Sequence, residues 1–326
     1  MLFFSIGLFL SSQATLNKKL FVMNRKSCFK QSGINGKVKS IETKTYYISR
    51  KSGEIKKGKL KHFDLEVYDE DGYRLSHNFR TSKFNMKVLS EYDSNMNILK
   101  ESVFEKEALD YEMIYKYDLN GNLIEELVVY PNDNYRGGTK YEYDSKGKVI
   151  KEHISNSEDL DRVQIRKYDT EGKEIEFYSF CGGEPNSKNI YKHDSKGNTI
   201  EINYYDEKEK LIGIHKYEYD SNGNKTEFVY LANGKLIKKN IFNSNGNVVE
   251  MYYSNSEGNL YLRLKYNYNS LGNFREKYSY DSKNNITYQE THQYELDQYN
   301  NWIKDIILKS KRGSEIIIRK IEYYED

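Results

Sequence analysis

The stretch Tyr219–Asn224 reads YDSNGN, and close variants of it recur along most of the chain. The copies include Tyr117–Asn122, Phe242–Asn247 and Tyr268–Asn273. A glycine fills the fifth position of eight copies: Gly72, Gly121, Gly147, Gly172, Gly197, Gly223, Gly246 and Gly272. Met96 and Asn300 replace it in two more, and consecutive positions are 23 to 28 residues apart. The chain is therefore a tandem array of about ten units of about 25 residues.

The repeated motif predicts a turn between two strands. Asp at the first position and Gly at the fourth position are typical of a type I turn. The residue before the glycine is Lys, Glu or Leu in several copies, and these residues resist the positive φ that a type I′ turn would require. We expect a type I turn followed by a left-handed glycine in a β-bulge. Asn300 tolerates that conformation, whereas Met96 predicts a distorted turn.

The sequence around each turn predicts strands. Tyrosines recur two residues apart before the turns, as in Tyr115 and Tyr117, so their side chains share one face. Weaker turn signals fall halfway between the motifs, at Gly138, Gly182-Gly183, Asn233-Gly234, Glu257-Gly258 and Asn284-Asn285. Two turns per unit mean two strands per unit. The predicted fold class is all-β: tandem β-hairpin repeats forming a long meandering, curved antiparallel sheet or a partial shell.

Composition agrees with a strand-rich, ordered protein. Apolar residues make up 37% of the chain, which is more than a disordered chain carries. The 32 tyrosines favour pleated, half-buried surfaces. Lys plus Arg total 51 and Asp plus Glu total 49, so the formal net charge is +2. Because a dedicated nucleic-acid binder carries a clustered basic excess, this balance argues against nucleic acid as a partner.

The N-terminus carries the one localisation signal. Residues 1–10 are nearly all apolar, and Ser12 and Ala14 place small residues before a cleavage point. This pattern predicts a bacterial secretory signal peptide over 1–14, and hence export to the periplasm, the cell surface or the medium. The first lysine is Lys18, so the usual basic segment is missing. The alternative is an apolar segment that packs on the first repeat of a cytoplasmic protein.

The remaining chain divides into a lead-in over 15–60, the repeat array over 61–305 and a C-terminal capping hairpin over 306–326. No second apolar run approaches the roughly 18 residues of a membrane helix, so we expect no membrane span. Cys28 and Cys181 match no metal spacing and no disulfide framework, which favours two free thiols.

Metal and catalytic motifs have simpler explanations here. Asp118, Asn120 and Asn122 resemble the start of a calcium loop, but position twelve is Val129 rather than Glu, and a turn explains the same residues. The six histidines show no short metal spacing, so we expect no metal and no cofactor. Acidic side chains recur in register at Glu125, Glu176, Glu201, Glu227, Glu250 and Glu276. Paired carboxylates could hydrolyse glycosides, but a solubilising charge on the wet face is the better interpretation.

The candidate ligand contacts are aromatic. Exposed rings can stack on sugars or peptides, and the candidates are Tyr117, Tyr143, Tyr219, Tyr268 and Trp302. The alternative is that the tyrosines only pack the sheet, because aromatic cross-strand pairs stabilise sheets by themselves. The segment Pro131–Gly138 is either a recognition loop or an ordinary insertion.

The Tyr-Asp-x-x-Gly-Asn units, over about residues 65–305, resemble the YD-repeat proteins, which are related to the RHS-repeat proteins of bacterial surfaces. The resemblance implies a meandering β-sheet that often curls into a shell, in exported or cell-surface proteins linked to carbohydrate binding or toxin delivery. Residues 299–303, which include Trp302, are similar to a Gly-Asn-Trp variant in small exported proteins of this kind. The Asp-Pro-x-Gly core motif of the large relatives is missing, since the only prolines are Pro131 and Pro185. The resemblance therefore implies an isolated repeat module without the core and without a toxin domain.

Three functions follow from these patterns. The first is an exported, non-enzymatic scaffold or binding module at the surface or in the periplasm, with a glycan or a protein as ligand. The second is an intracellular interaction or immunity-type protein with no cleaved signal. The third is an enzyme with an unfamiliar site, which would need clustered polar groups in a pocket; no motif in the sequence indicates one.

Overall fold

The computed structural model describes residues 34–325 except 52–53, 132–134, 156–160 and 312. The predicted signal peptide over 1–14 and Cys28 lie outside the described residues, and Cys181 is a free thiol in the eleventh strand. Among the described residues, none forms a helix with the length and apolarity that crossing a membrane requires.

Twenty-two strands form a single sheet. They are β1 (Val38–Lys51), β2 (Glu54–Tyr68), β3 (Arg74–Thr81), β4 (Asn85–Tyr92), β5 (Ile98–Glu105), β6 (Ala108–Tyr117), β7 (Leu123–Tyr130), β8 (Tyr135–Tyr143), β9 (Val149–Ser155), β10 (Arg162–Tyr168), β11 (Glu174–Cys181), β12 (Glu184–His193), β13 (Thr199–Tyr205), β14 (Leu211–Tyr219), β15 (Lys225–Leu231), β16 (Leu236–Phe242), β17 (Val248–Ser254), β18 (Leu260–Tyr268), β19 (Phe274–Asp281), β20 (Ile286–Leu296), β21 (Trp302–Lys309) and β22 (Glu315–Tyr323). Each strand pairs antiparallel with the next, as the repeat predicts.

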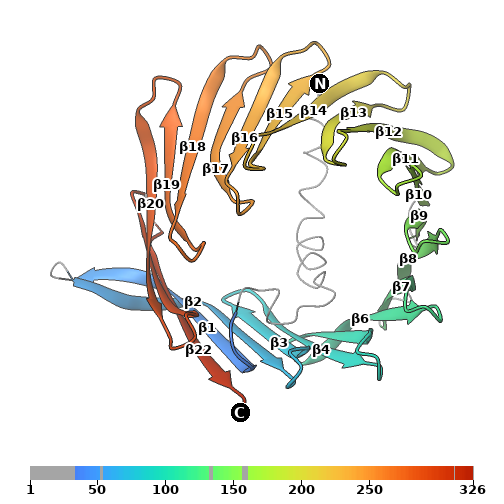
Figure 1. The fold of residues 1–326 in the computed structure, drawn as a ribbon. Coiled ribbons are helices and arrows are strands. Elements are labelled where there is room, and N and C mark those ends of the chain that lie inside the picture. Colours follow the sequence, from blue (N-terminus) through green and yellow to red (C-terminus); the bar gives the residue numbers. More distant parts are fainter. Residues whose placement is uncertain (1–33, 52–53, 132–134, 156–160, 312, 326) are drawn as a thin grey trace.

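The sheet closes on itself, which corrects the prediction of an open curved sheet or partial shell. Strand β22 pairs antiparallel with β1, in a register that runs from Val38 opposite Tyr323 to Tyr47 opposite Glu315. Figure 1 shows the resulting ring of strands. Closure gives each of the 22 described strands two neighbours, so none of them is an edge strand of the sheet. The predicted lead-in and capping hairpin therefore contribute wall strands, β1, β2 and β22, to the same barrel.

The β1–β2 hairpin is longer than the others and extends beyond the ring (Figure 1). Its pairs Ile48 with Lys57 and Lys51 with Glu54 continue the ladder past the point where β22 ends its pairing with β1. The two strands are shifted in register on either side of Tyr46.

The repeated turn has the predicted geometry. In the unit at Asp118, the Gly121 N–H donates to the Asp118 carbonyl at 3.1 Å and Gly121 has φ +81°. The Asp118 carboxylate accepts the N–H groups of Asn120 and Asn122, each at 2.9 Å. All eight predicted turn glycines have positive φ. Each turn is therefore held by a backbone hydrogen bond and by an aspartate or asparagine side chain.

Met96 and Asn300 test the glycine position. Asn300 adopts φ +63°, as expected. The predicted distortion at Met96 is wrong, because Met96 takes φ +60° and its N–H still donates to the Asp93 carbonyl at 3.0 Å. The Asp93 carboxylate accepts two further N–H groups at 2.8 Å, which hold the turn although methionine is strained there.

The turns at the opposite end are more varied. Turns occur at Gly182-Gly183, Gly234, Gly258 and Asn284, as predicted. Gly138 is not a turn residue; it lies in β8 opposite Leu127. A Cβ there would lie 2.3 Å from the Glu126 carbonyl oxygen, so close backbone approach is the reason for glycine. Of the predicted recognition loop Pro131–Gly138, residues 135–138 belong to β8 and 132–134 are outside the described residues.

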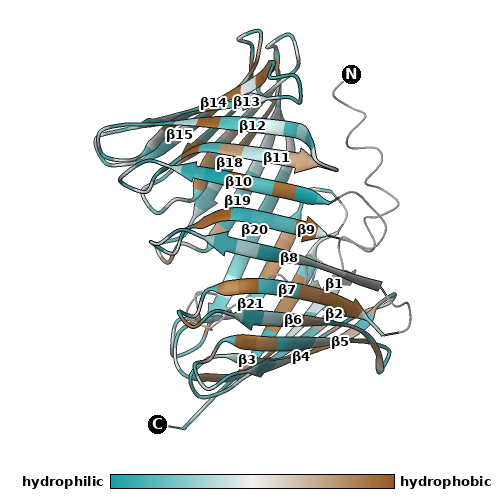
Figure 2. Cartoon of the chain, turned by 90° about the vertical axis from the view of Figure 1, so that its right-hand side faces the viewer, coloured by the Kyte–Doolittle hydropathy of each residue, from teal (hydrophilic) through white to brown (hydrophobic). Residues whose placement is uncertain are grey.

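The two faces of the sheet differ in chemistry, and hydrophilic and hydrophobic residues are interspersed along the strands in Figure 2. One face carries the tyrosine pairs and all the buried hydrophobic positions of β6, such as Met113 and Tyr115. Side chains inside a closed barrel converge while those outside diverge, so we assign this buried face to the interior. The outer face carries ion pairs between directly opposite residues, for example Lys116–Glu125 and Lys192–Glu201.

Tight packing is confined to one part of the wall. A cluster of buried residues joins β4, β5 and β6: Met86, Val88, Ile98, Val103, Tyr111, Met113 and Tyr115. A second cluster, Ile34, Val38, Ile41 and Tyr68, packs against Ile321 and Tyr323. This second cluster lies where β1, β2 and β22 close the barrel, and it stabilises that junction.

Candidate functional site

The four tyrosines predicted as ligand contacts lie on the inner face, on four separate strands. Each hydroxyl donates to the backbone carbonyl of the residue that begins a preceding strand: Tyr117 to Ile98, Tyr143 to Leu123, Tyr219 to Thr199 and Tyr268 to Val248, over 2.6 to 3.1 Å. These bonds link consecutive repeat units. The structure does not bring the four side chains together, and their contact with a ligand stays a prediction.

Trp302, the fifth predicted contact, lies where the barrel closes. It begins β21, and the Arg319 guanidinium of β22 lies 3.4 Å from its ring centroid. The Tyr294 ring is 6.2 Å from the same indole, at a tilted angle. A guanidinium over an indole is a strong cation–π arrangement, so Trp302 and Arg319 position one another.

The strands around Trp302 bring ionisable residues from both ends of the chain onto one face. We call this region the closing seam: the inner face of β20, β21, β22, β1, β2 and β3. Register places Asp305 opposite Tyr294, Arg319 opposite Thr43, and Thr43 opposite Asp64. The closing seam therefore combines residues separated by more than two hundred positions in sequence.

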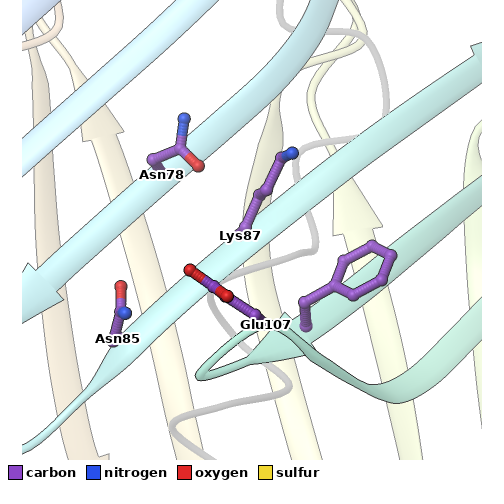
Figure 3. A pocket seen from close by; sticks show the side chains of 5 residues that line it. Asn78, Asn85, Lys87 and Glu107 are labelled. Carbon is purple, nitrogen blue, oxygen red and sulfur yellow. The ribbon is translucent and has the colours of Figure 1, made fainter.

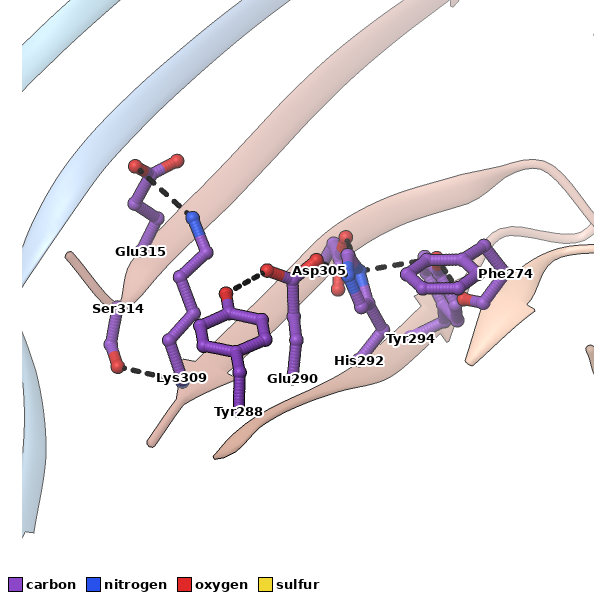
Figure 4. A network of polar contacts seen from close by, with 9 residues as sticks. All are labelled: Phe274, Tyr288, Glu290, His292, Tyr294, Asp305, Lys309, Ser314 and Glu315. Carbon is purple, nitrogen blue, oxygen red and sulfur yellow. Dashed lines mark hydrogen bonds and ion pairs between the residues drawn. The ribbon is translucent and has the colours of Figure 1, made fainter. Parts of the chain in front are cut away.

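His292 is held between two carboxylates at the closing seam (Figure 4). Its Nδ1 lies 2.7 Å from an Asp305 oxygen and its Nε2 lies 3.2 Å from a Glu290 oxygen. Burial lowers the pKa of His292, but its hydrogen bonds to Asp305 and Glu290 outweigh burial and raise that pKa to about 9. The hydrogen bond from His292 in turn holds the pKa of Glu290 down to about 2. At neutral pH the imidazolium is therefore charged between two carboxylates.

The network continues on both sides of His292. The Tyr288 hydroxyl donates to Glu290 at 2.5 Å, and the Tyr294 hydroxyl donates to the Phe274 carbonyl at 2.5 Å. Burial raises the pKa of both tyrosines, so both remain hydrogen-bond donors at neutral pH. Figure 4 shows these side chains in one row along β20.

A hollow of about 500 Å³ opens on the inner face of β22, β1, β2 and β3. Its walls include the hydroxyls of Thr43 and Thr45, the charged groups of Asp64 and Arg319, and the His77 ring. His77 Nε2 lies 2.9 Å from an Asp64 oxygen. Hydrogen-bonding groups with one aromatic wall are typical of a polar ligand site.

Three buried polar atoms at the closing seam have no hydrogen-bond partner among the described residues: Arg74 Nε and Arg319 Nε, which are donors, and Asp305 Oδ1, an acceptor. Burial lowers the pKa of Arg319 to about 10, although Glu66 and neighbouring anions oppose this shift. Buried polar groups in proteins are nearly always satisfied. A donor and an acceptor left over on adjacent strands are suited to a ligand group that both donates and accepts.

Further ionisable residues lie between the closing seam and the hydrophobic cluster of β4, β5 and β6. Arg74 lies 3.7 Å from Glu66 and 3.5 Å from Glu101. Glu101 is almost fully buried, and burial raises its pKa, although Arg74 and the Tyr115 hydroxyl stabilise its charge. Tyr115 donates to Glu101 at 3.0 Å. Arg74, Glu101 and Tyr115 therefore connect the closing seam to the hydrophobic cluster.

Sequence reasoning identified Trp302 but missed its partners. A usable signal was present: His292 occupies the first position of a Tyr-x-Tyr pair, ahead of Tyr294. Arg319 likewise interrupts the apolar run of β22. These substitutions mark an inner-face position whose chemistry differs from that of the other units.

Comparison with known proteins gives distant structural likenesses only. No protein-family model matches the chain, and no curated protein matches it. A crystal structure of TcdB2-TccC3 without its hypervariable C-terminal region aligns with 81% of this chain and 15% of its own, at 13% identity and TM-score 0.38. The Photorhabdus luminescens Tc holotoxin pore, TccC3-D651A, aligns with 75% of this chain and 17% of its own, at 13% identity and TM-score 0.25.

A porin-like protein from Bacteroides uniformis aligns with 89% of this chain and 99% of its own, at 8% identity and TM-score 0.29. The chain thus spans about one sixth of the two toxin components that it matches. Likenesses at these values do not establish a family, and the resemblance to YD-repeat proteins rests on the repeated motif.

Proposed function

We propose that this protein is an exported, non-enzymatic binding module that holds a glycan at the closing seam. The observation that carries the proposal is Arg319, which lines the hollow of about 500 Å³ and whose buried Nε has no partner among the described residues. Asp305 Oδ1, on the neighbouring strand β21, is likewise unsatisfied. A sugar hydroxyl can both donate and accept hydrogen bonds, so a glycan carries groups suited to an unpaired donor and to an unpaired acceptor. The Trp302 ring, whose centroid lies 3.4 Å from the Arg319 guanidinium, adds an aromatic side chain on the neighbouring strand β21.

The closed barrel supports binding rather than turnover. The ionisable groups of the closing seam are engaged with one another in fixed pairs, such as His292 with Asp305 and His77 with Asp64. Because a closed antiparallel sheet holds these pairs on rigid strands, the site is preorganised for recognition. We therefore place the function in a scaffold or binding role.

The test is glycan binding by the full chain, compared between two arginine variants. Arg319→Met removes the unsatisfied donor while keeping a long apolar side chain. Arg263→Met is the matched control, since Arg263 Nε also lacks a partner among the described residues but lies on the outer face, over the Tyr252 and Tyr280 rings. We expect glycans selected from a panel to lose at least tenfold in affinity with Arg319→Met and to be unaffected by Arg263→Met. Equal effects of both variants, or no binding of any glycan by the wild type, would contradict the proposal.

Export is tested separately, by mass spectrometry of the mature N-terminus in fractionated cells. A chain that begins near Thr15 in the envelope or medium supports the export step. An intact Met1 in the cytoplasm contradicts it and favours the intracellular interaction protein.

A further inference from the structure

A second hollow, of about 330 Å³, lies on the outer face over β3, β4 and β5. It is lined by Asn78, Asn85, Lys87, Phe104 and Glu107, drawn in Figure 3. Asn78, Lys87 and Phe104 form one row across three strands, because Lys87 lies directly opposite Asn78 on β3 and Phe104 on β5. Glu107 reaches the row from the turn between β5 and β6.

The charges in this hollow are not paired, whereas many Lys and Glu side chains elsewhere on the outer face are. Lys and Glu at directly opposite positions form ion pairs at 2.5 to 2.9 Å along the wall, for example Lys116–Glu125 and Lys167–Glu176. Within the described residues, neither Lys87 nor Glu107 has an ion pair or a side-chain hydrogen bond, and the two Asn side chains have none either. The hollow thus holds a cation, an anion and two amides that a ligand could engage.

The turn that carries Glu107 is strained. Lys106 and Glu107 form a two-residue hairpin loop with φ +50° and +72°. Such a type I′ turn prefers Asn-Gly, because both residues have positive φ. The Lys106 N–H donates to the Asn85 carbonyl at 3.0 Å, which ties the turn to β4 beside the hollow. Backbone strain is often found at functional sites, and this turn places Glu107 in the lining of the hollow that Lys87 also lines.

We infer that this hollow binds a zwitterionic small molecule, an α-amino acid with an apolar side chain. Lys87 would bind the carboxylate and Glu107 the ammonium group, since each supplies the opposite charge. The amides of Asn78 and Asn85 can donate to the carboxylate or accept from the ammonium group. The Phe104 ring, which is half-buried, provides the contact for the apolar side chain. The site lies on the opposite face of the wall from the closing seam and is independent of the glycan proposal.

The experiment is a titration of the full chain with L-phenylalanine, followed by NMR of the backbone amides of Lys87, Phe104 and Glu107. Two blocked analogues separate the charges: N-acetyl-L-phenylalanine lacks the cation, and L-phenylalanine amide lacks the anion. We expect saturable shifts with L-phenylalanine in the millimolar range. Because the groups are solvent-exposed, each blocked analogue should bind about three- to tenfold more weakly.

Variants of the same charges complete the test. Lys87→Gln and Glu107→Gln should each weaken binding of L-phenylalanine, while the charge-swapped double variant Lys87→Glu, Glu107→Lys should recover part of it. Lys116→Gln, on a paired outer-face lysine, is the matched control and should leave binding unchanged. Lys106→Asn, which relieves strain and keeps Glu107, should stabilise the fold and retain binding.

Three outcomes would overturn the inference. The first is equal affinity for L-phenylalanine and both blocked analogues. The second is the absence of saturable shifts at these amides. The third is a neutral sugar that shifts the same amides as strongly, which would make the hollow a saccharide site instead.

Discussion

The barrel wall divides into a packed wall, β3–β6, and a long wall, β7–β19, that are built on different physics. In the packed wall, side chains such as Ile98, Val103 and Tyr111 are almost completely buried. Of the residues described between Tyr117 and Ile306, no hydrophobic side chain is fully buried. The same repeat motif therefore supports a hydrophobic core in one place and a thin sheet in another.

The long wall is held by contacts that repeat with the sequence. Its outer face carries cross-strand ion pairs, worth about 0–1 kcal/mol each, and its inner face carries the tyrosine hydroxyl bonds to preceding carbonyls. Each unit contacts only its neighbours, so stability accumulates along the array as in other repeat proteins. The packed wall and the closing seam add contacts that do not repeat along the chain. Substitutions there should therefore lower the free energy of unfolding more than substitutions in the long wall.

Removing a buried side chain should have the largest effect. Ile98→Ala in the packed wall should lower the free energy of unfolding by about 2–5 kcal/mol, because it leaves a cavity in a filled cluster. Ile202→Ala, on the half-buried inner face of β13, should cost about 1 kcal/mol or less because less surface is uncovered. Urea unfolding of both variants measures the difference. Equal midpoints would mean that the two walls do not differ in packing.

The closing seam and the long wall should also respond to pH in opposite directions. The pKa of His292 is about 9 when folded and about 6.5 when unfolded, a difference of about 3 kcal/mol. Its contribution is complete below pH 6.5 and is lost as pH rises through 9. Burial lowers the pKa of His215 in the long wall, although Glu227 opposes the shift, so His215 favours the folded state above pH 6.5 and disfavours it in acid.

Unfolding of His292→Gln and His215→Gln from pH 5 to 10 tests this contrast. His292→Gln should lose most stability relative to wild type at pH 6 and least near pH 10. His215→Gln should gain relative to wild type as pH falls below 6. A constant difference for His292→Gln across the range would show that its imidazolium is not stabilised by Asp305 and Glu290.

The turn glycines should give an intermediate effect that isolates backbone strain. Gly121 has φ +81° and nothing within 4 Å of an added Cβ, so Gly121→Ala should cost about 1–2 kcal/mol from conformation alone. Met96→Gly, at φ +60° in the equivalent turn, should stabilise the protein by up to about 1 kcal/mol. Thermal unfolding of the two variants measures the expected loss of stability in Gly121→Ala and the expected gain in Met96→Gly. A destabilised Met96→Gly variant would mean that the Met96 side chain contributes more than its strain costs.

The smallest effect should come from the hydroxyl bonds between units. Tyr143→Phe removes the bond to the Leu123 carbonyl and should cost about 1 kcal/mol. Phe242 stands at the equivalent position of its own unit with no hydroxyl, so Phe242→Tyr should add a bond and stabilise by up to about 1 kcal/mol. Chemical unfolding of both variants tests the pair. If Tyr143→Phe is neutral, these hydroxyls do not link the units energetically.

Local features of the fold could be predicted from the sequence because they depend on a few adjacent residues. The turn at Asp118 follows from the Asp and Gly positions, and the shared face of Tyr115 and Tyr117 follows from strand alternation. Met96 was mispredicted because the Asp93 side-chain hydrogen bonds outweigh the strain of a left-handed methionine. At Gly138, glycine reflects backbone proximity within a strand, which resembles a turn signal in sequence.

Closure of the barrel and the closing seam could not be predicted in this way. Nothing local in Val38–Lys51 or Glu315–Tyr323 specifies that the two strands pair. The candidate site follows from that pairing, because Thr43 and Arg319 become neighbours only when the ring is closed. Trp302 was visible as an unusual aromatic residue, but its partner Arg319 was recognisable only in three dimensions.

The pairing of β1 with β22 also constrains how the chain is made. Strand β1 leaves the ribosome well before its partner Glu315–Tyr323, which follows it by more than 260 residues. At about 5–20 residues per second, one edge of β1 waits on the order of tens of seconds for its neighbour. Nascent chains that stop before β22 would present two open strand edges, which can pair with other copies. Synthesis of β22 is therefore the step that closes the ring and covers both open edges.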